Sequence, residues 1–94
     1  KAGLINLTQT LAMELADDNI QVNAIAPGLV QTKFARAIWE NDLLMDEMMK
    51  RIPQRRLGQP GDIAGIAVFL ASSASDFATG QTFVIDGGIT IPML

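Results

Sequence analysis

The sequence contains no cysteine and no histidine. Their absence excludes a disulfide framework, zinc sites built from these residues, a cysteine nucleophile and a Ser-His-Asp triad within the chain. It fits a reducing compartment, and we expect a cytoplasmic protein. Long apolar runs are also missing, because the longest, residues 64–71, is far shorter than the roughly 18–20 residues of a membrane-spanning helix. We therefore expect no contact with a membrane.

Charge is scarce and slightly acidic. Charged side chains make up 18% of the 94 residues, and seven basic against ten acidic ones leave a net charge of −3. This argues against a nucleic-acid partner, because duplex binding needs a clustered positive field. The densest basic cluster, Lys50-Arg51 with Arg55-Arg56, is interpreted as a solvated helix end. Hydrophobic residues make up 49%, enough for the core of one small domain or of part of a larger one.

The beginning of the chain has the pattern of an amphipathic helix, from Lys1 to about Ala16. Its core-facing stripe has helical spacing and comprises Leu4, Leu7, Thr8, Leu11, Ala12 and Leu15. Asp17-Asp18-Asn19 stops this helix, because carboxylates disfavour a helix C-terminus and Asn tolerates the left-handed conformation. Adjacent residues point in different directions, so the two aspartates are interpreted as a solvated turn rather than a metal or acid–base pair. No metal site is expected.

Two segments have the pattern of buried strands. Residues 20–26 are mostly apolar and end at Pro27-Gly28, and residues 81–86 form the second strand. Asn23 lies in the first, where we expect its amide to tie strand to loop rather than to catalyse. A helix that starts at Pro60-Gly61-Asp62 lies between the strands, which predicts a right-handed parallel crossover. Because two strands cannot make a stable open sheet alone, we expect an α/β domain with further strands.

Residues 33–52 differ from the rest in combining methionines and aromatic residues with interspersed charges. Their apolar side chains fall on two helical faces, and we predict two short helices joined at Asn41-Asp42. Methionine side chains adapt to irregular apolar ligands, which suits a binding insert. An ordinary helical hairpin packed on the domain explains the pattern equally well.

A longer motif spans the end of the first strand. Residues 23–32, Asn-Ala-Ile-Ala-Pro-Gly-Leu-Val-Gln-Thr, resemble the Asn-x-(apolar)-x-Pro-Gly-x-(apolar)-x-Thr segment of the short-chain dehydrogenase/reductases. Further segments resemble the C-terminal signature of that family in order and spacing, at residues 56–60, 62–64, 69–72, 79–81 and 86–88. The ordered set covers nearly the whole chain. Residues 26–32, with Trp39 nearby, look most like the peroxisomal-type carbonyl reductases, and the resemblance to the 3-oxoacyl-carrier-protein reductases is nearly as good.

The resemblance implies a fold and a division of the chain. Residues 1–94 would be the C-terminal part of a single NAD(P)-binding domain, a Rossmann-like doubly wound parallel sheet. The order would be helix, strand, helical lid, helix and strand, with residues 33–52 as the substrate lid. The apolar wall of this lid would favour a hydrophobic carbonyl or alcohol and would comprise Phe34, Ile38, Trp39, Met45, Met48 and Met49.

The resemblance also implies site residues. Lys1 matches the lysine of the family's Tyr-x-x-x-Lys motif, which lowers the pKa of that tyrosine and holds the nicotinamide ribose; by itself it is a solvated chain end. The Val30 backbone would bind the nicotinamide carboxamide, and the Thr32 hydroxyl the carboxamide or the phosphate. Pro27 would fix the exit from the strand, and Gly28 would leave room for a flat ring. The residues alone equally allow a plain turn and an N-cap at Thr32.

The implied activity is reversible hydride transfer between NAD(P)(H) and a carbonyl or alcohol. Nothing in the sequence matches the family's glycine-rich phosphate loop, its catalytic Ser and Tyr, or the residue that selects NAD or NADP. Both cofactors therefore stay open, and we expect the isolated 94 residues to be inactive. The sequence also lacks an initiator Met and a signal peptide, and we expect the protein to begin upstream.

Two other interpretations remain. One is a non-catalytic oligomerisation or domain-completing module. In the homodimers and homotetramers of the family, the helix that matches the beginning of this chain packs against its symmetry mate, and the last helix and strand form a second interface. The leucine stripe and the apolar tail at residues 89–94 suit such contacts, and exposed strand edges favour association. The other is an unrelated small α/β protein that folds alone as a monomer.

Overall fold

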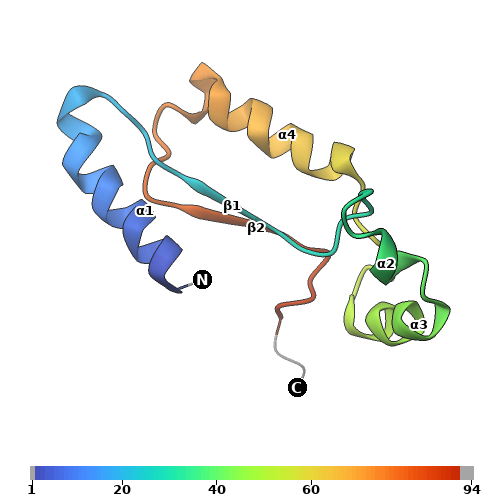
Figure 1. Ribbon diagram of the computed structural model, residues 1–94. Coiled ribbons are helices and arrows are strands. Elements are labelled where there is room, and N and C mark those ends of the chain that lie inside the picture. Colours follow the sequence, from blue (N-terminus) through green and yellow to red (C-terminus); the bar gives the residue numbers. More distant parts are fainter. Residues whose placement is uncertain (1, 92–94) are drawn as a thin grey trace. The chain divides into compact units, whose positions relative to one another are not determined.

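The computed structural model describes residues 2–91 (Figure 1). Its elements, in chain order, are α1 (Ala2–Leu15), a 3₁₀ turn (Ala16–Asp18), β1 (Ala24–Pro27), α2 (Arg36–Trp39), α3 (Asp42–Arg51), α4 (Pro60–Ala71), a second 3₁₀ turn (Ser73–Ser75) and β2 (Thr82–Ile85). β1 and β2 are parallel, because the Ala24 N–H donates to the Gln81 carbonyl and the Gly28 N–H donates to the Ile85 carbonyl at the same sequence offset. This confirms the predicted α/β class and the parallel crossover.

The described residues divide into two compact units. The first unit holds residues 2–26 and 65–84, and the second holds residues 27–64 and 85–91. No helix within residues 2–91 combines the length and the apolar character needed to cross a membrane.

In the first unit, α1 ends as the sequence predicts. Asn19 has φ 57°, and its N–H donates to the Ala16 carbonyl at 3.0 Å. The Ile20 N–H donates to the Leu15 carbonyl at 3.2 Å. Together these two bonds form a Schellman motif, with the left-handed residue at the position where Asn is tolerated.

Side chains from helices and strands meet in the same unit. The Phe69 ring of α4 packs edge-to-face on the Phe83 ring of β2, with centroids 6.4 Å apart. A Cβ on Gly80 would lie 3.4 Å from the Cβ of Ala12, so α1 packs closely on the loop before β2. Ala12 and Ser75 are buried, and the Ser75 hydroxyl donates to carbonyls at the end of α4.

The first strand is shorter than the predicted residues 20–26, and that part of the prediction was wrong. The Val22 N–H donates to the Thr79 hydroxyl rather than to a strand carbonyl. The Asn23 Nδ2 donates to the Ala78 carbonyl at 3.0 Å, and its Oδ1 accepts from the Gln81 N–H at 3.1 Å. Before Ala24 the backbone contributes the bond from the Gly80 N–H to the Val22 carbonyl at 2.7 Å, and side chains supply the contacts of the Val22 N–H and of Asn23. The expectation that Asn23 ties strand to loop is confirmed.

The second unit contains α2 and α3, which confirm the two short helices predicted around Asn41-Asp42. The Asn41 Oδ1 accepts from the Leu44 N–H at 3.0 Å and caps α3. Asp42 lies in the first turn of α3 and Lys50 and Arg51 in its last, which complements the helix dipole. Most of these helical side chains are exposed, and the buried apolar residue of the unit is Ile52, directly after α3.

Candidate functional site

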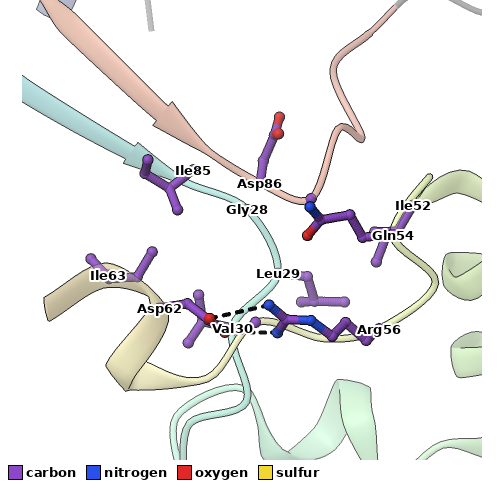
Figure 2. Close-up of a pocket in the computed structure, with 12 residues that line it drawn as sticks. Gly28, Leu29, Val30, Ile52, Gln54, Arg56, Asp62, Ile63, Ile85 and Asp86 are labelled. Carbon is purple, nitrogen blue, oxygen red and sulfur yellow. Dashed lines mark hydrogen bonds and ion pairs between the residues drawn. The ribbon is translucent and has the colours of Figure 1, made fainter. Parts of the chain in front are cut away.

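A pocket of about 100 Å³ lies in the second unit, beside the points where the chain leaves β1 and β2 (Figure 2). Ligands in parallel α/β sheets bind outside these carboxyl ends of the strands. The residues that line the pocket come from four segments and comprise Gly28, Leu29, Val30, Ile52, Gln54, Arg56, Gly58, Asp62, Ile63, Ile85, Asp86 and Gly87. Two predicted cofactor-binding residues, Gly28 and Val30, are among them.

Gly28 makes the closest backbone approach in the pocket. A Cβ built on Gly28 would lie 2.7 Å from both the Cα and the Cβ of Asp86, which no side chain tolerates. That Gly28 leaves room for a flat ring stays a prediction. The structure adds a further requirement for glycine, because Asp86, which follows β2, fills the space that a side chain would take.

Val30 pairs with Gly58 in a single parallel bridge. The Gly58 N–H donates to the Leu29 carbonyl at 2.9 Å, and the Gln31 N–H donates to the Gly58 carbonyl at 2.8 Å. In this arrangement the N–H and C=O of Val30 itself point away from Gly58. Within residues 2–91, neither group has a hydrogen-bond partner. Val30 therefore presents one donor and one acceptor, side by side.

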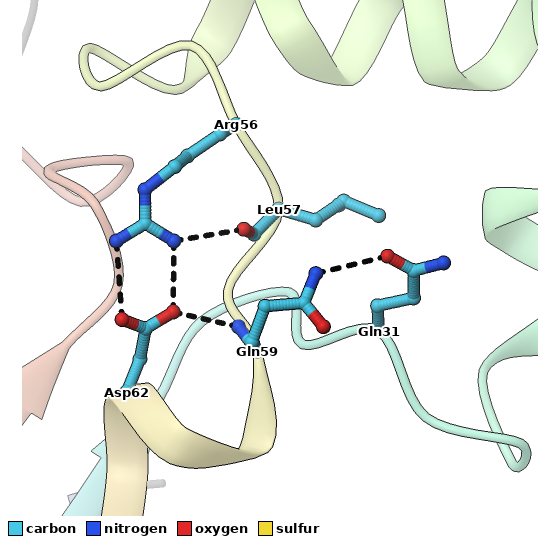
Figure 3. Close-up of polar contacts among 5 residues, drawn as sticks. All are labelled: Gln31, Arg56, Leu57, Gln59 and Asp62. Carbon is cyan, nitrogen blue, oxygen red and sulfur yellow. Dashed lines mark hydrogen bonds and ion pairs between the residues drawn. The ribbon is translucent and has the colours of Figure 1, made fainter.

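Arg56 and Asp62 form a two-pronged ion pair beside this bridge (Figure 3). Arg56 Nη1 lies 2.8 Å from Asp62 Oδ2, and Nη2 lies 3.1 Å from Oδ1. Asp62 Oδ2 also accepts from the Gln59 N–H at 2.7 Å, as an N-terminal carboxylate of α4. The hydrogen bond from Arg56, and then that from Gln59, lowers the pKa of Asp62 to about 2. The same hydrogen bond to Asp62 raises the pKa of Arg56.

Asp86 organises the turn after β2. Its carboxylate accepts from the Thr90 hydroxyl at 2.6 Å and from the Gly88 N–H at 2.8 Å. These bonds, that from the Thr90 hydroxyl foremost, lower the pKa of Asp86. Gly87 has φ 65°, and a Cβ there would lie 2.9 Å from the Ile52 side chain. The turn is thus closed by its own carboxylate and packed against the segment that leaves α3.

The other predicted site residues lie outside the pocket lining. Pro27 is exposed at the end of β1. The Thr32 hydroxyl accepts from the Ala35 N–H at 3.2 Å, one residue before α2, so it caps the turn that leads into the helix. Lys1 lies outside the described residues.

The six residues of the predicted substrate wall are in the second unit, but none lines the pocket. Phe34 is fully exposed, and Ile38 is 37% exposed. Trp39 is half-buried, and its indole Nε1 donates to the Thr32 carbonyl at 2.8 Å. Met45, Met48 and Met49 are half-buried on α3. Among the described residues there is no group of three or more side chains arranged to hold a metal ion.

Sequence reasoning missed the pairing of Arg56 with Asp62 and the bridge to Gly58. The sequence predicts that Arg56 belongs to a solvated basic cluster and that Asp62 lies at the start of a helix. The available signal was a basic residue six positions before an acidic residue in the first turn of a helix that starts with proline.

A family model described as Enoyl-(Acyl carrier protein) reductase matches residues 1–90. The chain belongs to the short-chain dehydrogenase/reductase family, which confirms the predicted membership. It is 47% identical over 88 residues to dehydrogenase/reductase SDR family member 4 of Homo sapiens, covering 94% of this chain and 32% of that protein. It is 48% identical over 90 residues to the 3-oxoacyl-(acyl-carrier-protein) reductase FabG of Chlamydia pneumoniae, covering 96% and 36%.

Solved structures agree with the fold. A 4-hydroxyisoleucine dehydrogenase complexed with NADH matches 98% of this chain and 38% of its own, with a TM-score of 0.94 and 37% identity. A gluconate 5-dehydrogenase from Burkholderia cenocepacia, in complex with NADP and tartrate, matches 99% and 36%, with a TM-score of 0.92 and 40% identity. The predicted Rossmann-like fold is thereby confirmed. The chain spans about a third of the length of the relatives that it matches.

Proposed function

We propose that this chain supplies the nicotinamide-binding loop and the substrate lid of an NAD(P)(H)-dependent oxidoreductase that interconverts a carbonyl and an alcohol. The observation that carries the proposal is the outward-facing N–H and C=O of Val30, held at the carboxyl end of a parallel strand. Solved relatives with NADH and with NADP support a nicotinamide dinucleotide of either kind.

The Val30 groups fit a primary carboxamide. A carboxamide carries one acceptor oxygen and a donor NH₂, so it can accept from the Val30 N–H and donate to the Val30 carbonyl. When bound, the nicotinamide supplies or removes the hydride in the reaction. The role of Val30 is to hold the orientation of the ring, which fixes the face and the distance presented to the substrate.

Four further residues have assigned roles in the proposal. Pro27 fixes the direction in which the chain leaves β1, and Gly28 lets the loop lie against Asp86. The Thr32 hydroxyl accepts a bond from the Ala35 N–H, and its own hydrogen remains available for the carboxamide or a phosphate. Lys1 holds the nicotinamide ribose and tunes the tyrosine that exchanges a proton with the substrate oxygen.

The lid at residues 33–52 would select the substrate. Its methionine side chains are half-buried and can repack around an apolar molecule. Phe34 is fully exposed and has no contact to lose when it covers a ligand. These features support a hydrophobic carbonyl or alcohol rather than a charged one.

Assembly follows from the surface of α1. Leu4, Leu7 and Met13 are more than half exposed, at 61%, 53% and 82%. Apolar side chains gathered on one helix favour burial in a subunit contact. We propose a single Rossmann-like domain in a homodimer or homotetramer that works in the cytoplasm.

The test uses the complete natural polypeptide that carries this sequence and replaces Val30 by proline, with Val30→Ala as the matched control. Proline removes the N–H, whereas alanine keeps both backbone groups. We expect V30P to weaken NADH or NADPH binding by about tenfold and V30A to bind almost normally. In a second measurement, the amide resonance of Val30 should shift when the cofactor is added to the unchanged protein. A stationary resonance, or equal loss in both variants, contradicts the proposal.

The isolated 94 residues should show no turnover with any carbonyl substrate, because no residue in them matches the tyrosine and serine of the family. The measurement is NAD(P)H oxidation by the purified chain, with a host strain deleted for contaminating reductases as the control. Sustained turnover by the chain would contradict the proposal that the catalytic tyrosine and serine lie outside these 94 residues.

The exposed leucines of α1 also favour the second candidate, an oligomerisation or domain-completing module without catalysis. Sedimentation of the isolated chain separates the two. A defined oligomer that dissociates when Leu4 and Leu7 are replaced by serine supports assembly as a role, and a folded monomer opposes it.

A further inference from the structure

Gly58 is held from both sides by hydrogen bonds to four different residues. The peptide group between Leu57 and Gly58 donates its N–H to the Leu29 carbonyl, and its carbonyl accepts from Arg56 Nη1 at 3.1 Å. In the peptide group between Gly58 and Gln59, the carbonyl accepts from the Gln31 N–H, and the N–H donates to Asp62 at 2.7 Å. Each peptide group is planar with its C=O and N–H on opposite sides, so a bond at one side constrains the other.

The peptide groups on either side of Gly58 are therefore hydrogen-bonded on one side to the ion pair and on the other side to the segment that contains Val30. Arg56 and Asp62 bond to the outer side (Figure 3). Leu29 and Gln31 bond to the inner side. A further bond, from Gln59 Nε2 to Gln31 Oε1 at 3.0 Å, joins the same two segments of the chain. A rotation of either peptide group therefore either breaks bonds on both sides or turns the Leu29–Gln31 backbone with it.

We propose that Arg56 and Asp62 are positioning residues that aim the Val30 N–H and C=O at the nicotinamide carboxamide through Gly58. Neither side chain touches the cofactor in this scheme. The inference rests on the proposed function for its consequence, but the coupling between the ion pair and the bridge is a property of this chain by itself.

The forked geometry makes the pair suitable for this role. A guanidinium and a carboxylate that meet through two parallel bonds resist rotation better than a single contact does. Arg56 also donates to the Leu57 carbonyl, and Asp62 also accepts from the Gln59 N–H. The pair therefore fixes the orientation of these two peptide groups as well as their distance from the side chains. A lysine at position 56 keeps the charge and loses the fork.

The first test measures hydrogen exchange of the Gly58 and Gln31 amides in the complete natural polypeptide, without cofactor. In Arg56→Met and in the isosteric Asp62→Asn, both amides should exchange about tenfold faster than in the unchanged protein. The matched control is Arg36→Met, which removes the ion pair of Arg36 with Glu40 on α2 at 2.6 Å. Unchanged exchange in both position-56 and position-62 variants overturns the proposed coupling.

The second test compares the dissociation constants of NADH and NADPH with those of ADP-ribose and its 2′-phosphate, which lack the nicotinamide. The two variants should weaken the nicotinamide-bearing ligands by about threefold to tenfold and leave the truncated ligands unchanged, with Arg56→Lys in between. Equal weakening of both ligand classes marks the pair as merely structural and overturns the inference. If the unchanged protein binds none of these ligands, the proposed function fails, while the exchange measurement still decides whether the ion pair controls the bridge.

Discussion

The pocket lining and the helices α2 and α3 are stabilised in opposite ways. Around the pocket, the bonds join residues far apart in sequence, such as Gly58 to Leu29 and Gln54 to the Gly87 carbonyl. In the helices the side-chain bonds are local, such as Arg36 to Glu40 and Leu44 to Asn41. Long-range bonds fix a backbone in one place, whereas local bonds let a segment move as a unit. The difference suits the two proposed roles, a fixed ligand-holding loop and a substrate lid that adapts.

The largest effect on stability is expected at Ile52, which is 2% exposed and lines the pocket. Ile52→Ala should lower the free energy of unfolding by about 2–5 kcal/mol, because it leaves a cavity where Gly87 and its neighbours pack. The measurement is urea unfolding of the complete polypeptide. Leu43→Ala on α3, at a side chain 83% exposed, is the control and should change stability by less than about 0.5 kcal/mol. Similar losses for the two variants would remove the distinction between the pocket lining and the helices α2 and α3.

A second effect is expected at Gly28. Gly28→Ala pushes a methyl group into the Asp86 backbone at 2.7 Å, and should cost about 1–3 kcal/mol of unfolding free energy. Gly61→Ala is the matched control, since nothing lies within 4 Å of the added carbon and alanine favours the helix. Thermal unfolding of both variants checks the pair. A tolerated alanine at position 28 means that the two strand ends are free to separate.

A smaller effect is expected where the lid is capped. Asn41→Ala removes the acceptor for the Leu44 N–H and should cost about 1 kcal/mol, with the loss confined to α3. Asn41→Asp keeps the acceptor and should cost little. Hydrogen exchange resolved by residue is the measurement, and faster exchange at Gly58 as well would show that the lid and the pocket are not independent.

The smallest expected effect is the loss of folding stability as acid protonates Asp62. The pKa of Asp62 falls from its ordinary 3.8 to about 2 in the folded protein, so the pair stabilises the fold fully above the unfolded value. This contribution disappears as the pH falls through the folded value. The expected result is a loss of stability between pH 4 and pH 2 that is smaller in Asp62→Asn, measured by the urea midpoint at each pH. An identical pH profile for the variant contradicts the pairing.

Sequence patterns predicted the helices well because their signals are local. Asn19, Asn41 and Pro60 mark helix ends by their own backbone preferences, and each end was found where expected. The parallel crossover followed from element order alone. The start of β1 was missed, because the Val22 N–H bonds to the Thr79 side chain and the side chains of Gln21 and Asn23 bond to backbone carbonyls before β2.

Family resemblance indicated Val30 and Gly28 as cofactor-binding residues; both line the pocket, and their roles stay predictions. The closeness of Asp86 adds a further reason for glycine at position 28. The six-residue spacing of Arg56 and Asp62 is a local signal that was overlooked, whereas no local pattern indicates that Gly58 meets Val30, because residues 31–57 separate them in the sequence. Only a folded chain shows which of several exposed charges is committed to a partner.

Asn23 has a practical consequence for anyone who engineers this chain. Its side-chain amide bonds to both the Ala78 carbonyl and the Gln81 N–H. These two bonds fix the number of residues that fit between them. An extra residue between those two contacts would leave at least one of them unmade. The exposed stretch at Asp76 and Phe77 lies before those two contacts, so a reporter peptide grafted there should leave the start of β2 in register.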